Sequence, residues 1–278
     1  MKKITSVVVL ALSLLSFKAI CQSKSEQDIK ISIDLNTIKE DRVTVVVTPP
    51  KFTTNEVTYN FPKIIPGTYS EDDYGKMIVN LKAFDKNGKE IAVNKMDENS
   101  WKVTDAKKLA KITYQVNDTF DSEKGTGFGQ DDIFSPAGTN IDAGKNFMIN
   151  THGFVGYFSD LKDITYTVSI AHPETLWGAT SMTDNDSSKT NDVFVTSRYA
   201  ELVENPIMYA KPDYTTFNVN GMDILIAVYS PNGVHTAESL TPEMKKVMIA
   251  QKNFLGKFNS TKKYSVLIYL SDLQKEDD

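Results

Sequence analysis

The sequence predicts a mainly β protein, with an antiparallel β-sandwich-type domain first and a shorter α/β segment after it. From Asp28 to Val195, short runs of alternating apolar and polar residues are separated by turn residues, a pattern typical of sandwiches. Asn87-Gly88 between two such runs is a strong hairpin signal. After residue 213 the pattern changes to two apolar strands around one helix, which indicates an α/β arrangement. We therefore divide the chain into residues 1–21, 22–213 and 214–278.

Residues 1–21 have the three parts of a signal peptide. Met1-Lys2-Lys3 is basic, Val7–Leu15 is apolar, and Ala19-Ile20-Cys21 precedes a cleavage site before Gln22. The apolar run is shorter than the roughly 20 residues of a membrane span. The sequence therefore predicts export to the periplasm or the extracellular space. We expect no membrane attachment unless Cys21 carries a lipid, which Lys18 and Ile20 disfavour.

The composition narrows the classes of partner. The chain has 278 residues, 40% of them hydrophobic, which suffices for a sizeable core. The net charge is −5, from 31 basic and 36 acidic residues, and no basic run exceeds two residues. This argues against nucleic acid and anionic membranes as partners. Cys21 is the single cysteine, so the mature domain is predicted to lack disulfides.

The first predicted strand is Asp28–Leu35, in which every second residue is Ile or Leu. Further runs that share β-branched or alternating apolar residues are Arg42–Thr48, Glu56–Phe61, Lys76–Ala83, Ile91–Val93, Lys111–Val116, Phe147–Ile149, Ile164–Ile170 and Val193–Val195.

The stretch Tyr59–Val103 is the most informative part of the predicted domain. Pro66-Gly67 predicts a type II turn, because proline fixes the first corner and glycine supplies a positive φ at the second. Met77, Val79, Leu81 and Ala83 are expected to share one face of the next strand, and Trp101 to be buried as a large apolar residue.

Two later segments leave alternatives open. Phe120–Ile133 is rich in glycine and acidic residues. A solvated loop is the default interpretation, since neither a strand nor a helix flanks it as a phosphate loop requires. Calcium ligation by its carboxylates does not fit the spacing of an EF-hand loop; these residues are Asp121, Glu123, Asp131 and Asp132. Tyr199–Val203 fits either one helical turn or an extended link.

The final segment begins with an apolar strand, Met222–Tyr229. Thr241-Pro242-Glu243 predicts a helix start, with an N-cap oxygen, proline at the first helical position and an acidic residue in the first turn. A second apolar strand follows at Tyr264–Leu270. Two strands and one helix leave sheet edges uncovered, so we expect further protein to pack against them.

Several motifs, taken in order, resemble the N-terminal region of the glycyl-aminopeptidase family, whose members are secreted, often PDZ-containing zinc peptidases of the gluzincin type. The resemblance covers most of the chain from Ile29 onward. The segments that carry it are Phe61–Tyr69 (FPKIIPGTY), Pro136–Asp142, Asn150–Phe158, Trp177–Ser181 and Glu204–Tyr209.

The resemblance implies a zinc metallo-aminopeptidase that releases small N-terminal residues such as glycine. In that family a Gly-x-Glu-His segment and a His-Glu-x-x-His helix would follow the point where this sequence stops. The chain is therefore expected to be the substrate-side scaffold and the opening of a thermolysin-like catalytic domain. We expect it to hold no cofactor and to be inactive alone, with zinc and the peptide substrate bound through the catalytic domain.

Apart from this resemblance, the sequence shows few candidate metal ligands or catalytic nucleophiles. His152, His172 and His235 lie far apart in the sequence, whereas a catalytic zinc needs several converging ligands. There is no Gly-x-Ser-x-Gly motif and no cysteine after residue 21 for covalent catalysis.

One pair of candidate substrate-binding residues comes from a more distant resemblance. Thr139–Asp142 is similar to a Thr-Gln-x-Glu segment of related zinc aminopeptidases, whose carboxylate reaches the α-ammonium group of the substrate. Here Asn140 replaces the Gln, and Asp142 is one methylene shorter than Glu. The resemblance implies that Asp142 binds the free N-terminus, with Asn140 beside it. The alternative is an Asp that hydrogen-bonds its own turn.

A rival interpretation is an exported, non-enzymatic β-sandwich module that binds glycan or protein. The aromatic content of 10% is compatible with a stacking surface, although aromatic residues in a sandwich more often form core and cross-strand pairs.

Overall fold

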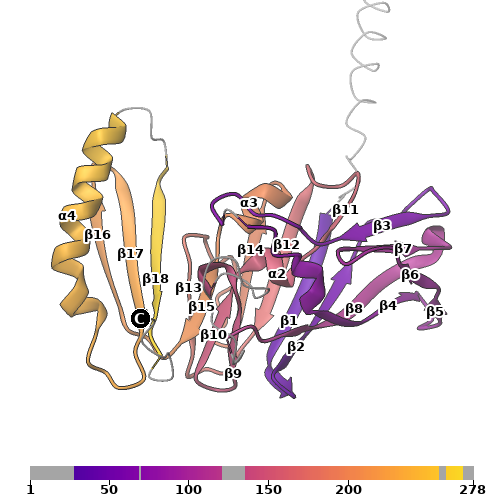
Figure 1. Cartoon of the computed structure of the whole chain (residues 1–278), viewed down its shortest axis with the longest axis horizontal. Helices are drawn as coiled ribbons and strands as arrows, with labels where there is room; N and C mark the ends of the chain where they lie inside the picture. Colours follow the sequence, from indigo (N-terminus) through magenta and orange to yellow (C-terminus); the bar gives the residue numbers. More distant parts are fainter. Residues whose placement is uncertain (1–27, 69, 121–134, 257–260, 272–278) are drawn as a thin grey trace, which may run out of the picture.

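The computed structural model describes residues 28–68, 70–120, 135–256 and 261–271. The predicted signal peptide with Cys21 and the predicted loop with the four carboxylates considered for calcium lie outside these residues. The described part is mainly β, with predominantly antiparallel sheets, which confirms the predicted fold class (Figure 1). Among the described residues, no helix has both the length and the apolar character needed to span a membrane.

A seven-stranded sheet, here called sheet A, is the largest element. Its first strand pairs with two neighbours, antiparallel to one and parallel to the other. Alternate residues of this strand are buried, from Ile29 to Leu35, so one face of the sheet is apolar as predicted. In spatial order the strands are β14 (Asn191–Thr196), β12 (Thr165–Ala171), β1 (Asp28–Lys39), β2 (Arg42–Thr48), β8 (Leu109–Asn117), β4 (Ile78–Asp85) and β5 (Glu90–Ile91).

Two four-stranded sheets share a hydrophobic core with sheet A. Tyr59 of sheet B packs on Tyr114 of sheet A, with their hydroxyls 3.1 Å apart. Tyr209 of sheet C hydrogen-bonds Asp192 of sheet A. Sheet B comprises β11 (Tyr157–Phe158), β3 (Val57–Asn60), β7 (Ser100–Val103) and β6 (Val93–Lys95), and sheet C comprises β13 (Trp177–Ala179), β15 (Ile207–Ala210), β10 (Asn146–Ile149) and β9 (Asn140–Asp142).

The C-terminal part forms a separate three-stranded sheet, sheet D, with its own hydrophobic cluster. It consists of β16 (Tyr214–Val219), β17 (Met222–Tyr229) and β18 (Lys263–Tyr269), with β17 and β18 parallel. Helix α4 (Ala237–Leu255) joins the two parallel strands and covers the face of sheet D that points away from the rest of the molecule (Figure 1). The opposite face meets sheet C.

Short helices connect the strands. Tyr199–Val203 is helical (α3), which decides the alternative that the sequence left open. The others are α2 (Thr151–Phe154) and three 3₁₀ turns, η2 (Tyr74–Met77), η3 (Ala106–Lys108) and η4 (Ser135–Ala137).

Both predicted turns are present. Gly67 has a φ of 101°, and the N–H of Thr68 donates to the carbonyl of Ile65 over 3.3 Å, as expected for glycine at the third position of a turn. At the predicted hairpin, Gly88 donates to the carbonyl of Asp85 over 3.0 Å and connects β4 to β5.

Two local predictions are wrong. In β4 the buried residues are Ile78 and Ala83, whereas the prediction placed Met77, Val79, Leu81 and Ala83 on one face. The alternation is interrupted because Asn80 has a φ of 56° and the pairing with β8 shifts register beside it. Such a bulge changes which face the following residues occupy. The last helix starts at Ala237, and Pro242 lies inside it, because Thr236 rather than Thr241 provides the N-cap.

Candidate functional site

The predicted substrate-binding residues lie on β9, the edge strand of sheet C. Asp142 is the last residue of β9 and pairs with Asn146 at the start of β10. The connecting turn contains Gly144 with a φ of 76°, and Lys145 donates its N–H to the carbonyl of Asp142 over 3.0 Å. The backbone therefore fixes Asp142 at a hairpin corner.

Asn140 is buried, and its side chain forms hydrogen bonds within sheet C. Its amide nitrogen donates to the side-chain oxygen of Asn146 over 2.7 Å, and the amide nitrogen of Asn146 donates to the carbonyl of Tyr209 over 3.3 Å. The chain of amides ties β9 and β10 to β15. Asn140 therefore holds the strand that carries Asp142.

The carboxylate of Asp142 is partly open to solvent, with 39% of the side chain exposed. Its ion-pair partner is Lys145, at 3.4 Å, whose side chain is 70% exposed. An exposed pair of this kind contributes at most about 1 kcal/mol, so another cation can displace Lys145 at little cost.

The segment that follows β8 fixes the start of β9. One carboxylate oxygen of Asp118 accepts the N–H of Phe120 over 2.5 Å, and the other accepts the N–H of Ile141. Thr119 and Thr139 hydrogen-bond each other, with the hydroxyl of Thr119 accepting the N–H of Thr139 over 2.8 Å. These contacts hold the backbone on the N-terminal side of Asp142.

Asp142 lies near the junction between sheet C and sheet D. At this junction the rings of Trp177 and Tyr214 stack with centroids 4.4 Å apart. The ring of Tyr269, at the end of β18, packs 5.1 Å from that of Phe120. Burial raises the pKa of Tyr269, and the negative charges of Asp118 and Asp142 add to this rise.

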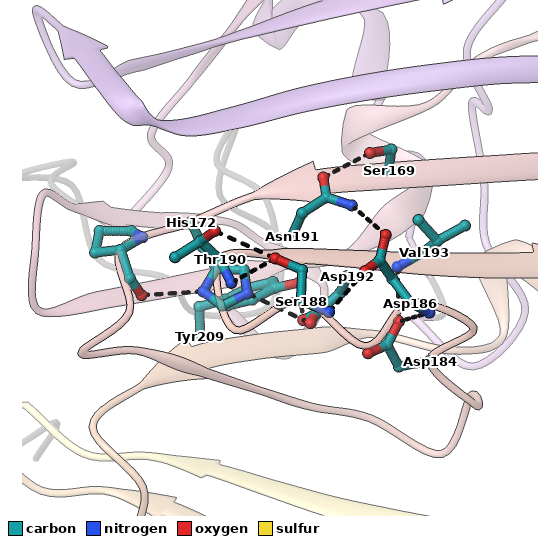
Figure 2. Close-up of polar contacts among 11 residues, drawn as sticks. Ser169, His172, Asp184, Asp186, Ser188, Thr190, Asn191, Asp192, Val193 and Tyr209 are labelled. Atoms are coloured by element: carbon teal, nitrogen blue, oxygen red, sulfur yellow. Dashed lines mark hydrogen bonds and ion pairs between the residues drawn. The ribbon is translucent and has the colours of Figure 1, made fainter.

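The three histidines occupy separate places in the structure. His152, in α2, is buried against Tyr74, and its Nε2 lies 3.0 Å from the carbonyl of Ala137. His172 follows β12 and lies beside Asp192 (Figure 2). His235 is exposed before α4. Within the described ranges, no group of three or more His, Cys, Asp or Glu side chains is arranged to hold a metal ion.

Sequence reasoning missed two features near these sites. Asp118, 23 residues before Ile141, accepts a hydrogen bond from β9. Asp192 lies on β14, the neighbour of β12 in sheet A, and contacts His172 from there. Both contacts depend on how strands pair, which no local spacing reveals.

Comparison with family models gives the decisive observation: residues 30–211 match the peptidase M61 N-terminal domain. The chain belongs to the peptidase M61 family. The matched residues include sheets A, B and C and therefore the hairpin that carries Asp142. The described part thus contains the N-terminal domain of an M61 peptidase.

One solved structure shares the fold of this M61 chain, and others match it more weakly. An aminopeptidase N family protein from Idiomarina loihiensis superposes with a TM-score of 0.70 at 17% identity, over 90% of this chain and 44% of that one. An M1 zinc metallopeptidase from Deinococcus radiodurans, an E323A mutant bound to Tyr-Ser-Ala, gives a TM-score of 0.45 at 12% identity, over 87% and 56%. The chain thus spans about half the length of these structures. No curated protein matches the sequence significantly.

Proposed function

We propose that this chain is the N-terminal, substrate-side portion of an exported zinc aminopeptidase that releases small N-terminal residues such as glycine. The match of residues 30–211 to the M61 N-terminal domain carries this proposal. Zinc does not fit the described residues, because their histidines are separate and no suitable group of ligands surrounds any of them. We therefore assign no catalytic step to this part, which is inactive without the rest of the catalytic domain.

In this proposal the described residues position the substrate. The carboxylate of Asp142 binds the α-ammonium group of the peptide, replacing its weak pair with Lys145. A hydrogen bond between two charged groups contributes about 1.5–3 kcal/mol. Two features support the assignment: the fixed hairpin corner and the partly open carboxylate. Sheet D would begin the catalytic domain.

The substitution Asp142→Asn in the full-length enzyme tests this role. We expect kcat/KM for a glycyl peptide to fall about 10- to 100-fold, which corresponds to the loss of one charge-assisted contact. The amide keeps the size of the side chain, and its position is partly open to solvent, so Tm should change little. The measurement is steady-state kinetics on a peptide with a free amino group.

Two matched variants complete this test. Asp160→Asn removes an exposed carboxylate outside sheet C and should leave kcat/KM unchanged. Lys145→Gln removes the competing cation and should leave kcat/KM unchanged or slightly raised. Wild-type kinetics in Asp142→Asn would show that this carboxylate stabilises only its own turn and does not bind the substrate.

A further inference from the structure

His172 is buried between two oxygen acceptors. Its ring is 4% exposed. Nδ1 lies 3.0 Å from the carbonyl oxygen of Pro173, and Nε2 lies 3.3 Å from Oδ1 of Asp192. Oδ2 of the same carboxylate accepts the hydroxyl of Tyr209 over 2.6 Å (Figure 2). We use the name His172 cluster for His172, Asp192 and Tyr209.

The two acceptors favour the doubly protonated ring. A neutral imidazole carries one N–H, so one of its nitrogens has a lone pair beside an oxygen, whereas the imidazolium carries an N–H on each nitrogen. The contact of Nε2 with Asp192 is close but poorly aligned for a hydrogen bond. Its strength therefore depends on the opposite charges rather than on hydrogen-bond geometry.

The charged and titratable groups around the ring come from several elements. Asp192 is on β14 and Tyr209 on β15, and Asp184 lies in the loop before β14. Glu174, two residues after His172, is paired with Lys189 at the surface over 3.5 Å. Burial opposes the charge on His172, but the contact with Asp192, the carbonyl of Pro173 and the charge of Asp184 outweigh it, so the pKa of His172 is raised.

The His172 cluster joins two sheets. His172 directly follows β12 and Asp192 belongs to β14, two strands of sheet A, whereas Tyr209 belongs to sheet C. The rings of His172 and Tyr209 also pack with centroids 4.9 Å apart. The packing is tight, since a Cβ at Gly178 would lie 2.6 Å from Oδ2 of Asp192 and 2.9 Å from the ring of Tyr209.

We propose that the His172 cluster is a proton-controlled contact between sheet A and sheet C, strong at mildly acidic pH and weakened above neutral pH. Loss of the proton removes the ion pair and leaves one ring nitrogen facing an oxygen without a hydrogen between them. The carboxylate of Asp192 then keeps only its bond from Tyr209. The proposal concerns the stability of the domain and is independent of peptidase activity.

The direction of the pH effect follows from linkage. The unfolded chain has an ordinary histidine pKa of about 6.5, and the pKa in the folded state is higher. Between these two values the folded state binds more protons, so the free energy of unfolding decreases as pH rises. The contribution is fully present below about pH 6.5 and is lost as pH passes through the folded pKa.

Urea unfolding of the chain between pH 5.5 and 9 tests the proposal. We expect the free-energy difference between wild type and His172→Gln to decrease as pH rises through this range. His235→Gln, which changes an exposed histidine, should follow the wild type. Asp192→Asn should lose the same pH dependence. A His172→Gln variant with the wild-type pH slope would overturn the proposal.

NMR on the folded wild type provides a readout that needs no stable variant. The Hε1 resonance of His172, assigned by elimination with His152→Gln and His235→Gln, should titrate above pH 6.5. Amides of β15 should lose protection from hydrogen exchange over the same range, after correction for intrinsic exchange. Titration of His172 at or below pH 6.5 would overturn the proposal. Unchanged protection of β15 would show that the proton on His172 does not control the contact between sheets A and C.

Discussion

His152 and His172 are both buried, but their surroundings affect their charge in opposite directions. His172 has a carboxylate beside it, whereas His152 lies against the ring of Tyr74 with one carbonyl acceptor. Its Nδ1 is buried without a hydrogen-bond partner. Burial therefore lowers the pKa of His152 to about 4, although the carbonyl of Ala137 and the charge of Asp72 act against this.

The low pKa of His152 should destabilise the domain in acid. In the unfolded chain this residue takes up a proton near pH 6.5, but in the folded state only near pH 4. Its contribution, roughly 3 kcal/mol for a shift of this size, is therefore present above pH 6.5 and lost as pH falls toward 4. Urea unfolding at pH 4.5, 5.5 and 6.5 should show a smaller pH dependence in His152→Gln than in the wild type. Equal slopes in the two proteins would contradict this, and His235→Gln is again the control.

At the scale of elements, helix α4 shows what residue patterns can and cannot determine. Thr241-Pro242-Glu243 predicts a helix start here, but the structure places the N-cap earlier, at Thr236. In the structure Thr236 and Ser239 form a reciprocal capping box, with Ser239 N–H to Thr236 Oγ1 at 3.2 Å and Thr236 N–H to Ser239 Oγ at 3.0 Å. The N–H of Ala237 also donates to Oδ1 of Asp213 over 3.1 Å, which ties the first turn to the residue before β16. This contact joins residues 24 positions apart, so a local window of sequence cannot reveal it.

Thr236→Ala should therefore weaken the start of α4. Loss of an N-cap oxygen typically costs about 0.5–2 kcal/mol. Thr236→Ser keeps the oxygen and should behave as the wild type. Hydrogen exchange of the amides at 237–240 measures the effect locally. Faster exchange in both variants, or in neither, would show that this capping box does not hold the helix end.

The strands and the candidate site show the same difference between what local sequence patterns predict and what tertiary contacts decide. The period of two in β1 and the glycine turns were sufficient to predict those elements, because each depends on neighbouring residues. The face of β4 was not predictable, since a bulge at Asn80 shifts it. Motif similarity singled out Asp142, but its place at a hairpin corner, the support from Asp118 and the amide chain through Asn146 depend on strand pairing.

At the scale of the whole molecule, sheets C and D meet through a small apolar cluster. Ala179 and Met208 of sheet C face Ala227 of sheet D, and each is at most 2% exposed. Lys263 adds a hydrogen bond to the hydroxyl of Thr183 over 2.8 Å. Small side chains at the centre allow the two sheets to approach closely.

Ala227→Glu should separate the two parts without unfolding residues 28–211. A buried, unpaired carboxylate costs several kcal/mol, and the larger side chain also overpacks the junction. We expect faster hydrogen exchange in β16, β17 and α4, with little change in sheet A. Ala227→Ser is a conservative control that should retain the junction. Equal destabilisation of sheet A in the Glu variant would show that the two parts unfold as one unit.

The position of β1 in sheet A has a consequence for biosynthesis. One edge of β1 pairs with its sequence neighbour β2, but the other pairs with β12, so that Asp28 meets Thr165. A chain that begins to fold during synthesis therefore keeps one edge of its first strand unpaired while more than a hundred further residues are translated. Open edges of this kind invite association with other chains. In such a chain that edge stays open until β12 has been made.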